Sequence, residues 1–278
     1  MRGDLLGRRS GRCRDREGRR IADARPAAFF DLDRTLIAGS SGIHFIRAAY
    51  GAGIVTRRRL VGDLAINVRF RLRGSTDALA DDVRERVGAM LAGLATRDLH
   101  RLSHHVLGGV IPNLYPEVLA LAHAHQDAGR PIYICTAASQ EMADLMALVL
   151  GFDGAIGSRS EILDGVYTGR PGGPFAYGAG KATLIAELAA AEGISLGESY
   201  AYSDSASDLP MLRAVGHPVA VNPDAELARL AALEGWPVLR YARRGRLIRR
   251  VAALGVAAVA GLGGGLAIGR RGSGRGRE

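Results

Sequence analysis

Short apolar runs that end in polar or turn-forming residues recur along the chain and predict buried strands. They cover residues 27–31, 132–136, 200–203, 218–221 and 238–241. Helical stretches separate most of these runs, and residues 161–168 predict a hairpin that turns at Asp164-Gly165. Because strands alternate with helices, we expect an α/β fold: a Rossmann-like, doubly wound parallel sheet with helices on both faces.

Residues 40–112 follow a helical period instead. One apolar stripe comprises Leu99, Leu102, Val106 and Val110, and three similar stripes precede it. Four amphipathic helices in succession predict a small α-helical bundle inserted into the sheet domain. We therefore expect a core of residues 27–39 and 113–241 and a helical cap of residues 40–112.

Positive charge gathers at the two ends of the chain. The 37 basic residues exceed the 28 acidic ones, but nine arginines lie in residues 1–26 and ten lie from Arg240 to Arg277. No aromatic residue accompanies the first run, so we interpret residues 1–26 as a disordered basic tail and do not expect nucleic acid as a partner. Two cysteines, and no apolar stretch in residues 1–26, fit a cytoplasmic catalytic domain.

Residues 242–278 contain an uncharged stretch from Val251 to Ile268 between two pairs of arginines. Its eighteen residues meet the minimum length of a membrane-spanning helix. We expect an anchor that holds the catalytic domain at the inner face of the cell membrane, because arginine is denser in residues 240–250. The alternative is a flexible low-complexity tail, since the stretch contains five glycines.

Polar residues follow three of the predicted strands at the same end. Asp31, Thr136 and Asp204 each close an apolar run, and the carboxyl ends of parallel strands meet at one edge of a sheet. Asp33 lies two residues after Asp31. Lys181, the only lysine of the chain, begins a predicted helix. A single compact ammonium in an arginine-rich chain indicates a specific electrostatic role.

These residue types fit the hydrolysis of a phosphate monoester. Asp31 is the candidate nucleophile, and Asp33 is the candidate acid that protonates the leaving oxygen and then activates water. Thr136 and Lys181 are candidates to bind the phosphate oxygens. Each has a structural alternative: Asp33 could cap a turn, Thr136 could cap the next helix, and Lys181 could be a surface residue.

Carboxylates cannot approach a phosphate dianion without a cation, so we expect Mg²⁺ as cofactor. The candidate ligands are Asp31, Asp33, Asp204 and Asp208, with Asp208 acting directly or through water. Asp208 could instead be an acidic residue at a helix N-terminus.

In this order, the tracts around Asp31, Thr136, Lys181 and Asp204 resemble the four motifs of the haloacid dehalogenase superfamily. They read Asp31-Leu-Asp33-Arg-Thr35-Leu, Ile-Cys-Thr136-Ala, Lys181 and Ser203-Asp204-Ser-Ala-Ser-Asp208. The resemblance covers residues 27–241, and the second aspartate implies a phosphatase. About a hundred residues separate Asp33 from Thr136 and about 45 separate Thr136 from Lys181. This spacing resembles subfamily IB, the phosphoserine-phosphatase-like branch, and implies a helical cap of the C1 type. The tracts of residues 201–212 and 216–224 resemble the actinobacterial members of that branch.

Two positions depart from that branch. Ser40 stands nine residues after Asp31, where phosphoserine phosphatases carry a glutamate that helps bind the substrate, and serines rather than glycines flank Asp204. We predict a Mg²⁺-dependent phosphomonoester hydrolase that acts on a small phosphorylated metabolite through an aspartyl-phosphate. One alternative is a phosphoserine phosphatase specifically. The other is a membrane-associated regulatory module that binds a phosphorylated ligand without turnover.

Overall fold

The computed structural model describes residues 24–54, 84–85, 87–89 and 91–241. Residues 1–23 of the basic N-terminal tail, the predicted cap helix of residues 60–72, part of the predicted cap helix of residues 79–94 and the stretch from Val251 to Ile268 lie outside these residues. Within the described ranges, no helix has both the length and the apolar character needed to cross a membrane.

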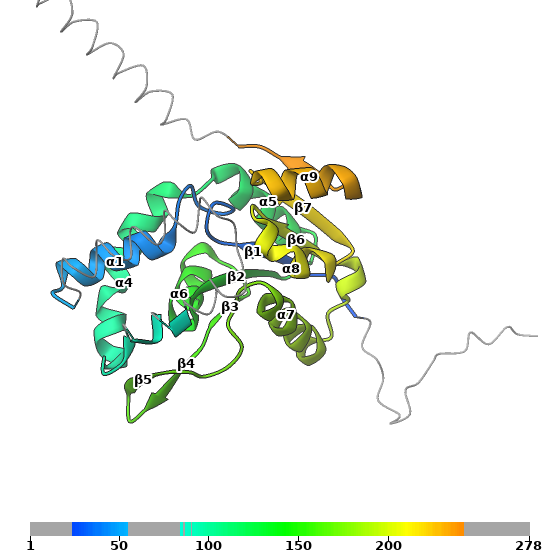
Figure 1. Ribbon diagram of the computed structural model, residues 1–278. Helices are drawn as coiled ribbons and strands as arrows, with labels where there is room; N and C mark the ends of the chain where they lie inside the picture. The colour runs from blue at the N-terminus through cyan, green and yellow to red at the C-terminus, as the bar shows by residue number, and fades with distance from the viewer. Residues whose placement is uncertain (1–23, 55–83, 86, 90, 242–278) are drawn as a thin grey trace, which may run out of the picture. The chain divides into compact units, whose positions relative to one another are not determined.

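The centre of the fold is a parallel sheet of six strands in the order β3-β2-β1-β6-β7-β8 (Figure 1). The strands are β1 Ala28–Asp31, β2 Ile132–Ser139, β3 Gly154–Ser158, β6 Tyr200–Ser203, β7 His217–Val221 and β8 Val238–Leu239. The chain runs from β1 to β2 and β3 on one side, then crosses to β6 on the other. This reversal next to β1 marks the crevice where such sheets bind ligands.

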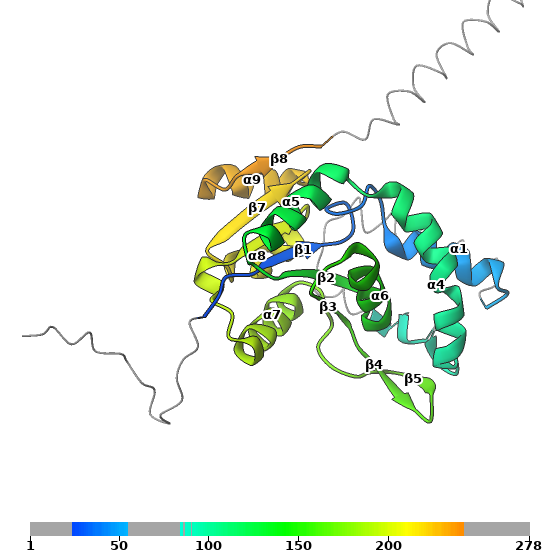
Figure 2. The same cartoon turned by 180° about the vertical axis from the view of Figure 1, so that it is seen from behind.

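Helices cover both faces of the sheet, as predicted (Figures 1 and 2). α5 (Pro116–Asp127) and α6 (Gln140–Leu150) pack on one face, and α7 (Ala179–Glu192), α8 (Leu209–Arg213) and α9 (Ala225–Glu234) pack on the other. The second face holds a buried cluster in which Phe29 and Tyr133 from the sheet meet Ile185, Leu212 and Leu227 from the helices. The doubly wound α/β class is confirmed.

Two described helices lie outside the sheet layers, α1 (Ser41–Gly51) and α4 (Thr96–Val110), and they pack against each other (Figure 1). α4 buries the four residues of its predicted stripe. α1 buries Ala48 and Ala49, whereas Tyr50 is 36% exposed. The two helices approach closely: a Cβ at Gly109 would come within 2.3 Å of His44 Nδ1, so a glycine fits this contact.

The two segments that join α1 and α4 to the sheet are bonded to each other. The backbone N–H of Tyr115 donates to Leu36 O at 2.8 Å, and that of Ala38 donates to Asn113 O at 2.7 Å. Three short helical turns complete the fold: η1 (Ile111–Asn113), η2 (Leu196–Glu198) and η3 (Ala206–Asp208). The junction between core and α1/α4 is therefore a paired, defined piece of backbone.

The predicted hairpin is present as β4 (Ser160–Leu163) and β5 (Val166–Pro171). Asp164 and Gly165 both have positive φ, 49° and 75°, which is the backbone of a type I′ turn. Tyr167 of β5 packs with Leu91 and Leu99, so the hairpin contacts the helical part of the chain.

His125 of α5 is almost fully buried. Arg130 Nε donates to His125 Nδ1 at 2.8 Å, and His125 Nε2 lies 2.7 Å from Tyr202 Oη. Since Nδ1 accepts a hydrogen bond, Nε2 carries the ring proton and donates a hydrogen bond to the Tyr202 hydroxyl. Burial, and then the positive charge of Arg130, lower the pKa of His125 to about 4.

We expect His125 to make the protein less stable in acid. Between pH 6.5 and pH 4 the unfolded His125 binds a proton that the folded one does not, so the free energy of unfolding falls as the pH falls through this range. The contribution is complete above pH 6.5 and on the order of 2–3 kcal/mol. Urea unfolding of His125→Gln should show a shallower pH dependence than the wild type or the exposed-site control His105→Gln. Equal slopes in all three proteins would contradict the role of His125.

Candidate active site

The three polar strand ends named from the sequence meet at one edge of the sheet. Asp31 ends β1, Thr136 lies in the neighbouring β2, and Asp204 follows β6 on the other side of β1. Lys181 lies in the first turn of α7, and Asp208 ends η3. All five side chains are buried.

Lys181 joins two of the carboxylates. Its Nζ lies 2.6 Å from Asp31 Oδ1 and 2.7 Å from Asp208 Oδ2, and the hydroxyl of Ser203 donates to the same Asp208 oxygen at 2.7 Å. The lysine is 2% exposed, so the alternative of a surface residue is wrong. The sequence-distant segments around residues 31, 181 and 208 are thus tied together by one ammonium group.

Burial and like charge set the protonation chemistry of this group. Burial raises the pKa of Asp31, an effect that Lys181 opposes and Asp208 reinforces. Burial alone would lower the pKa of Lys181, but the Asp208 and Asp31 carboxylates outweigh it and hold that pKa above its ordinary value. Lys181 is therefore a fixed positive charge beside the candidate nucleophile.

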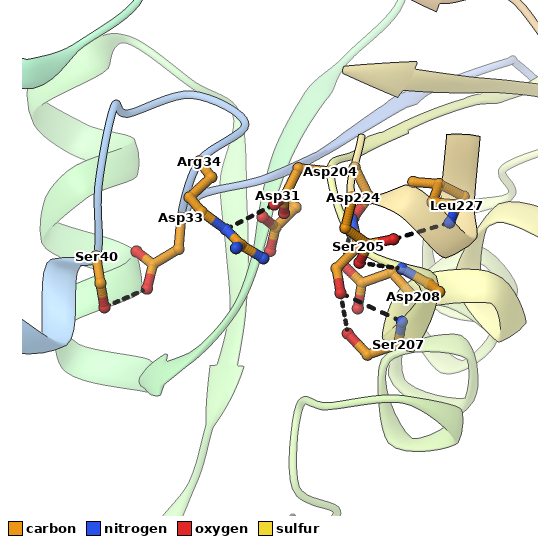
Figure 3. Close-up of polar contacts among 12 residues, drawn as sticks. Asp31, Asp33, Arg34, Ser40, Asp204, Ser205, Ser207, Asp208, Asp224 and Leu227 are labelled. Atoms are coloured by element: carbon orange, nitrogen blue, oxygen red, sulfur yellow. Dashed lines mark hydrogen bonds and ion pairs between the residues drawn. The ribbon is translucent and has the colours of Figure 1, made fainter. Parts of the chain in front are cut away.

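Asp204 has a different cationic partner. Arg34 Nε lies 2.7 Å from Asp204 Oδ2, and the two side chains face each other in Figure 3. Burial and the nearby Asp31 carboxylate raise the pKa of Asp204, against the charge of Arg34. Asp224 fixes the loop that follows β6. Its backbone N–H donates to Asp204 O at 2.8 Å, and its carboxylate accepts from Ala206 N at 3.1 Å.

Asp33 points away from the other carboxylates, toward the start of α1 (Figure 3). It accepts hydrogen bonds from Ser40 Oγ at 3.0 Å and from the backbone N–H of Ser41 at 2.8 Å. Ser40 is the N-cap residue of α1, but its own side chain makes no capping hydrogen bond. The Asp33 carboxylate caps the helix instead, through the N–H of Ser41. Asp33 therefore has a structural role at the start of a helix rather than in a turn, and the two bonds fix its carboxylate at the junction of core and α1.

Thr136 does not cap the following helix. Its Oγ1 accepts from Ala138 N at 3.2 Å, while Ser139 is the N-cap of α6 and accepts from Met142 N. The Thr136 hydroxyl therefore stays within β2, one residue after Cys135, which pairs with Asp31 at the end of β1.

The donor set fits a hard divalent cation. The candidate site contains four acidic and two basic side chains, so it carries two excess negative charges when all are ionised. The acids are Asp31, Asp33, Asp204 and Asp208, and the bases are Lys181 and Arg34. The like charges of Asp31 and Asp204 oppose each other's ionisation, which an oxygen-seeking cation would relieve. As the described residues stand, no three carboxylate, histidine or cysteine side chains surround a common point.

Two residues of this arrangement were not assigned a role from the sequence. Arg34 stands inside the first motif, but nothing in the sequence gives its left-handed backbone, φ 63°, or its direction. Asp224 could have been found as the N-cap of α9, because an aspartate before Ala225-Glu-Leu is a helix-start signal.

Comparisons with known proteins identify the family of the chain. A family model described as haloacid dehalogenase-like hydrolase matches residues 28–213. The chain is 39% identical over 238 residues to a probable phosphatase of Mycobacterium tuberculosis, covering 85% of this chain and 83% of the relative. It is 38% identical over 245 residues to a phosphoserine phosphatase of the same organism, covering 87% and 78%.

A solved structure, the phospho-aspartyl intermediate analogue of a phosphoserine phosphatase, has the same fold with a TM-score of 0.59 at 19% identity, over 82% of this chain and 99% of that one. The chain belongs to the haloacid dehalogenase-like hydrolase family. The expectation of an enzyme of this family is confirmed, and the relatives named as phosphatases support the phosphatase class.

Replacing Lys181 with methionine should destabilise the protein strongly, because Asp31 and Asp208 would stay buried without a counter-charge. We expect a loss of about 3–5 kcal/mol in the free energy of unfolding, measured in urea without divalent metal. The double variant Lys181→Met/Asp31→Asn should lose less, since one of the stranded charges is gone.

Arg213→Met is the matched control, because it removes the exposed ion pair between Arg213 and Glu234 and should change stability little. If Lys181→Met is no less stable than Arg213→Met, the buried bridge does not hold the site together.

Proposed function

We propose that this protein is a Mg²⁺-dependent phosphatase that hydrolyses phosphate monoesters of small metabolites through an aspartyl-phosphate on Asp31. The observation that carries the proposal is the buried bridge from Lys181 Nζ to Asp31 Oδ1 and Asp208 Oδ2. A structural ion pair would need one carboxylate; here one ammonium holds the candidate nucleophile and a second acid at the ligand-binding edge of the sheet.

In the first step, a carboxylate oxygen of Asp31 attacks phosphorus and the bond from phosphorus to the ester oxygen breaks. Asp33 gives its proton to the departing oxygen, which leaves as an alcohol. In the second step, Asp33 takes a proton from water, the water oxygen attacks phosphorus, and the bond to Asp31 breaks to release inorganic phosphate. Both steps balance without an oxidant or a second substrate.

The remaining residues stabilise charge and position. Lys181 places a fixed positive charge beside the transferring group, and the Thr136 hydroxyl can donate to a phosphate oxygen. Asp31 and Asp204 would hold Mg²⁺, with Asp208 and Asp33 as the further acids of the set. When bound, the metal neutralises phosphate charge so that a carboxylate can approach it.

The position of Asp33 suits its two proton transfers. Ser40 and Ser41 fix its carboxylate where the core meets α1, away from Asp204 (Figure 3). A general acid must reach the ester oxygen, which lies on the side of the phosphoryl group opposite the attacking carboxylate. In this proposal, α1 and α4 would close over the substrate, and the paired backbone at the junction would join them to the core.

Phosphoserine is the second candidate substrate, and the observation in its favour is the 38% identity to a phosphoserine phosphatase over most of both chains. Against it, Ser40 replaces the glutamate expected in that branch, and its hydroxyl is committed to Asp33. We therefore propose a small phosphorylated metabolite other than phosphoserine as the preferred substrate.

The test is phosphate release from O-phosphoserine, sugar phosphates, nucleotides and lysophosphatidic acid, with Mg²⁺ or with chelator. Wild type should release phosphate only with metal, and Asp31→Asn should release none. Asp33→Asn should lower kcat by about 10²- to 10⁴-fold, the usual contribution of a general acid–base.

Asp164→Asn is the matched control, because Asp164 is exposed in a left-handed turn position that asparagine also tolerates. It should be as active as the wild type. Full activity of Asp31→Asn, or release that does not need metal, would overturn the mechanism, while phosphoserine as the best ester would replace only the substrate assignment.

A further inference from the structure

Arg34 combines three properties that the proposed hydrolysis does not use. Its φ of 63° is in the left-handed region, which costs a non-glycine residue free energy. Its side chain is 43% exposed, yet its Nε lies 2.7 Å from the Asp204 carboxylate, which is 5% exposed. A long, partly exposed basic side chain thus reaches a buried acid (Figure 3).

The pairing is selective among the acids of the site. Lys181 forms ion pairs with Asp31 and Asp208. Asp33 accepts hydrogen bonds from Ser40 and Ser41. Across the described part of the chain, Arg34 is the basic residue paired with Asp204. A buried carboxylate without a counter-charge is costly, so Arg34 stabilises Asp204 while no other cation is present.

We propose that Arg34 is an internal competitor of the divalent metal: it occupies the Asp204 carboxylate in the metal-free protein and leaves it when the metal binds. This rests on the proposed function, in which Asp204 is a metal ligand. A guanidinium and a divalent cation repel each other and would share one buried carboxylate, so each weakens the binding of the other. Partial exposure gives the arginine side chain room to turn toward solvent.

Linkage between the two states has a direct consequence. Binding of the metal must break the Arg34–Asp204 pair, so the affinity measured for the metal is lower than that of a site without the arginine. Arg34 is thus a positioning residue that keeps Asp204 in place and sets the metal concentration at which the site fills. It does not need to contact the substrate to do so.

The test is a Mn²⁺ titration of the full chain, followed by electron paramagnetic resonance of free Mn²⁺ and without any substrate. Arg34→Gln and Arg34→Asn should bind Mn²⁺ about tenfold more tightly than the wild type, the change expected for removing one well-formed, partly buried ion pair. Asparagine tolerates the left-handed backbone, so Arg34→Asn keeps the test valid if glutamine at this position impairs folding.

Arg213→Gln is the matched control, since it removes an exposed arginine–glutamate pair of similar length, 2.6 Å, and should leave Mn²⁺ affinity unchanged. Equal or weaker Mn²⁺ binding in both Arg34 variants overturns the competition. Failure of the proposed function is recognised separately: the wild type then releases no phosphate, or Asp204→Asn binds Mn²⁺ as well as the wild type. A wild type that is active, with Arg34 variants of unchanged affinity, refutes the inference alone.

Discussion

Lys181 Nζ lies between Asp31 and Asp208 at the carboxyl edge of the sheet, and all three side chains are buried. Taking three charged groups out of water costs free energy. Their mutual attraction and the hydrogen bond from the Ser203 hydroxyl offset this cost. The bridge connects β1, the first turn of α7 and η3, which lie far apart in the sequence. It places the proposed nucleophile, a positive charge and a second acid together at one edge of the sheet.

A second connection links this edge to α1 and α4. Asp33 caps α1 through Ser41, so the proposed general acid is also the residue that fixes the first helix of the cap region. Movement of α1 relative to the sheet would therefore move the Asp33 carboxylate. In the proposed mechanism, this coupling would link closure of α1 to the position of the proposed general acid, which points away from Asp204 (Figure 3).

Local patterns predicted the elements that local chemistry determines. The apolar run before Asp31 became β1, and Asp164-Gly165 formed the hairpin turn because few other residue pairs adopt positive φ at both positions. Strand β3 was missed, since Gly154-Ala-Ile-Gly-Ser158 carries little of the β-branched or aromatic character of a strand. Its place at the sheet edge comes from pairing with β2, which a single sequence does not display.

The residues of the candidate site were predictable from the sequence, whereas most of their contacts were not. The order and spacing of Asp31, Thr136, Lys181 and Asp204 predicted which residues meet, because parallel strands bring their carboxyl ends to one edge. The partners of the charges were not predictable. That Arg34 turns onto Asp204 depends on one backbone angle and on the relative depth of the two side chains. The four-helix cap stays a prediction, since residues 55–83 lie outside the described part of the chain.

The central claim is that Asp31 carries the phosphoryl group, and trapping that group tests it most directly. The Asp33→Asn variant should be mixed with a substrate ester and Mg²⁺, quenched in acid and reduced with borohydride, which converts an acyl phosphate to the alcohol. With 4-nitrophenyl phosphate as the ester, the leaving group needs no proton from Asp33, while the variant still lacks the base that activates water. The intermediate should therefore accumulate, and peptide mass spectrometry should find homoserine at position 31. An unmodified Asp31 in a protein that still releases phosphate would contradict the account.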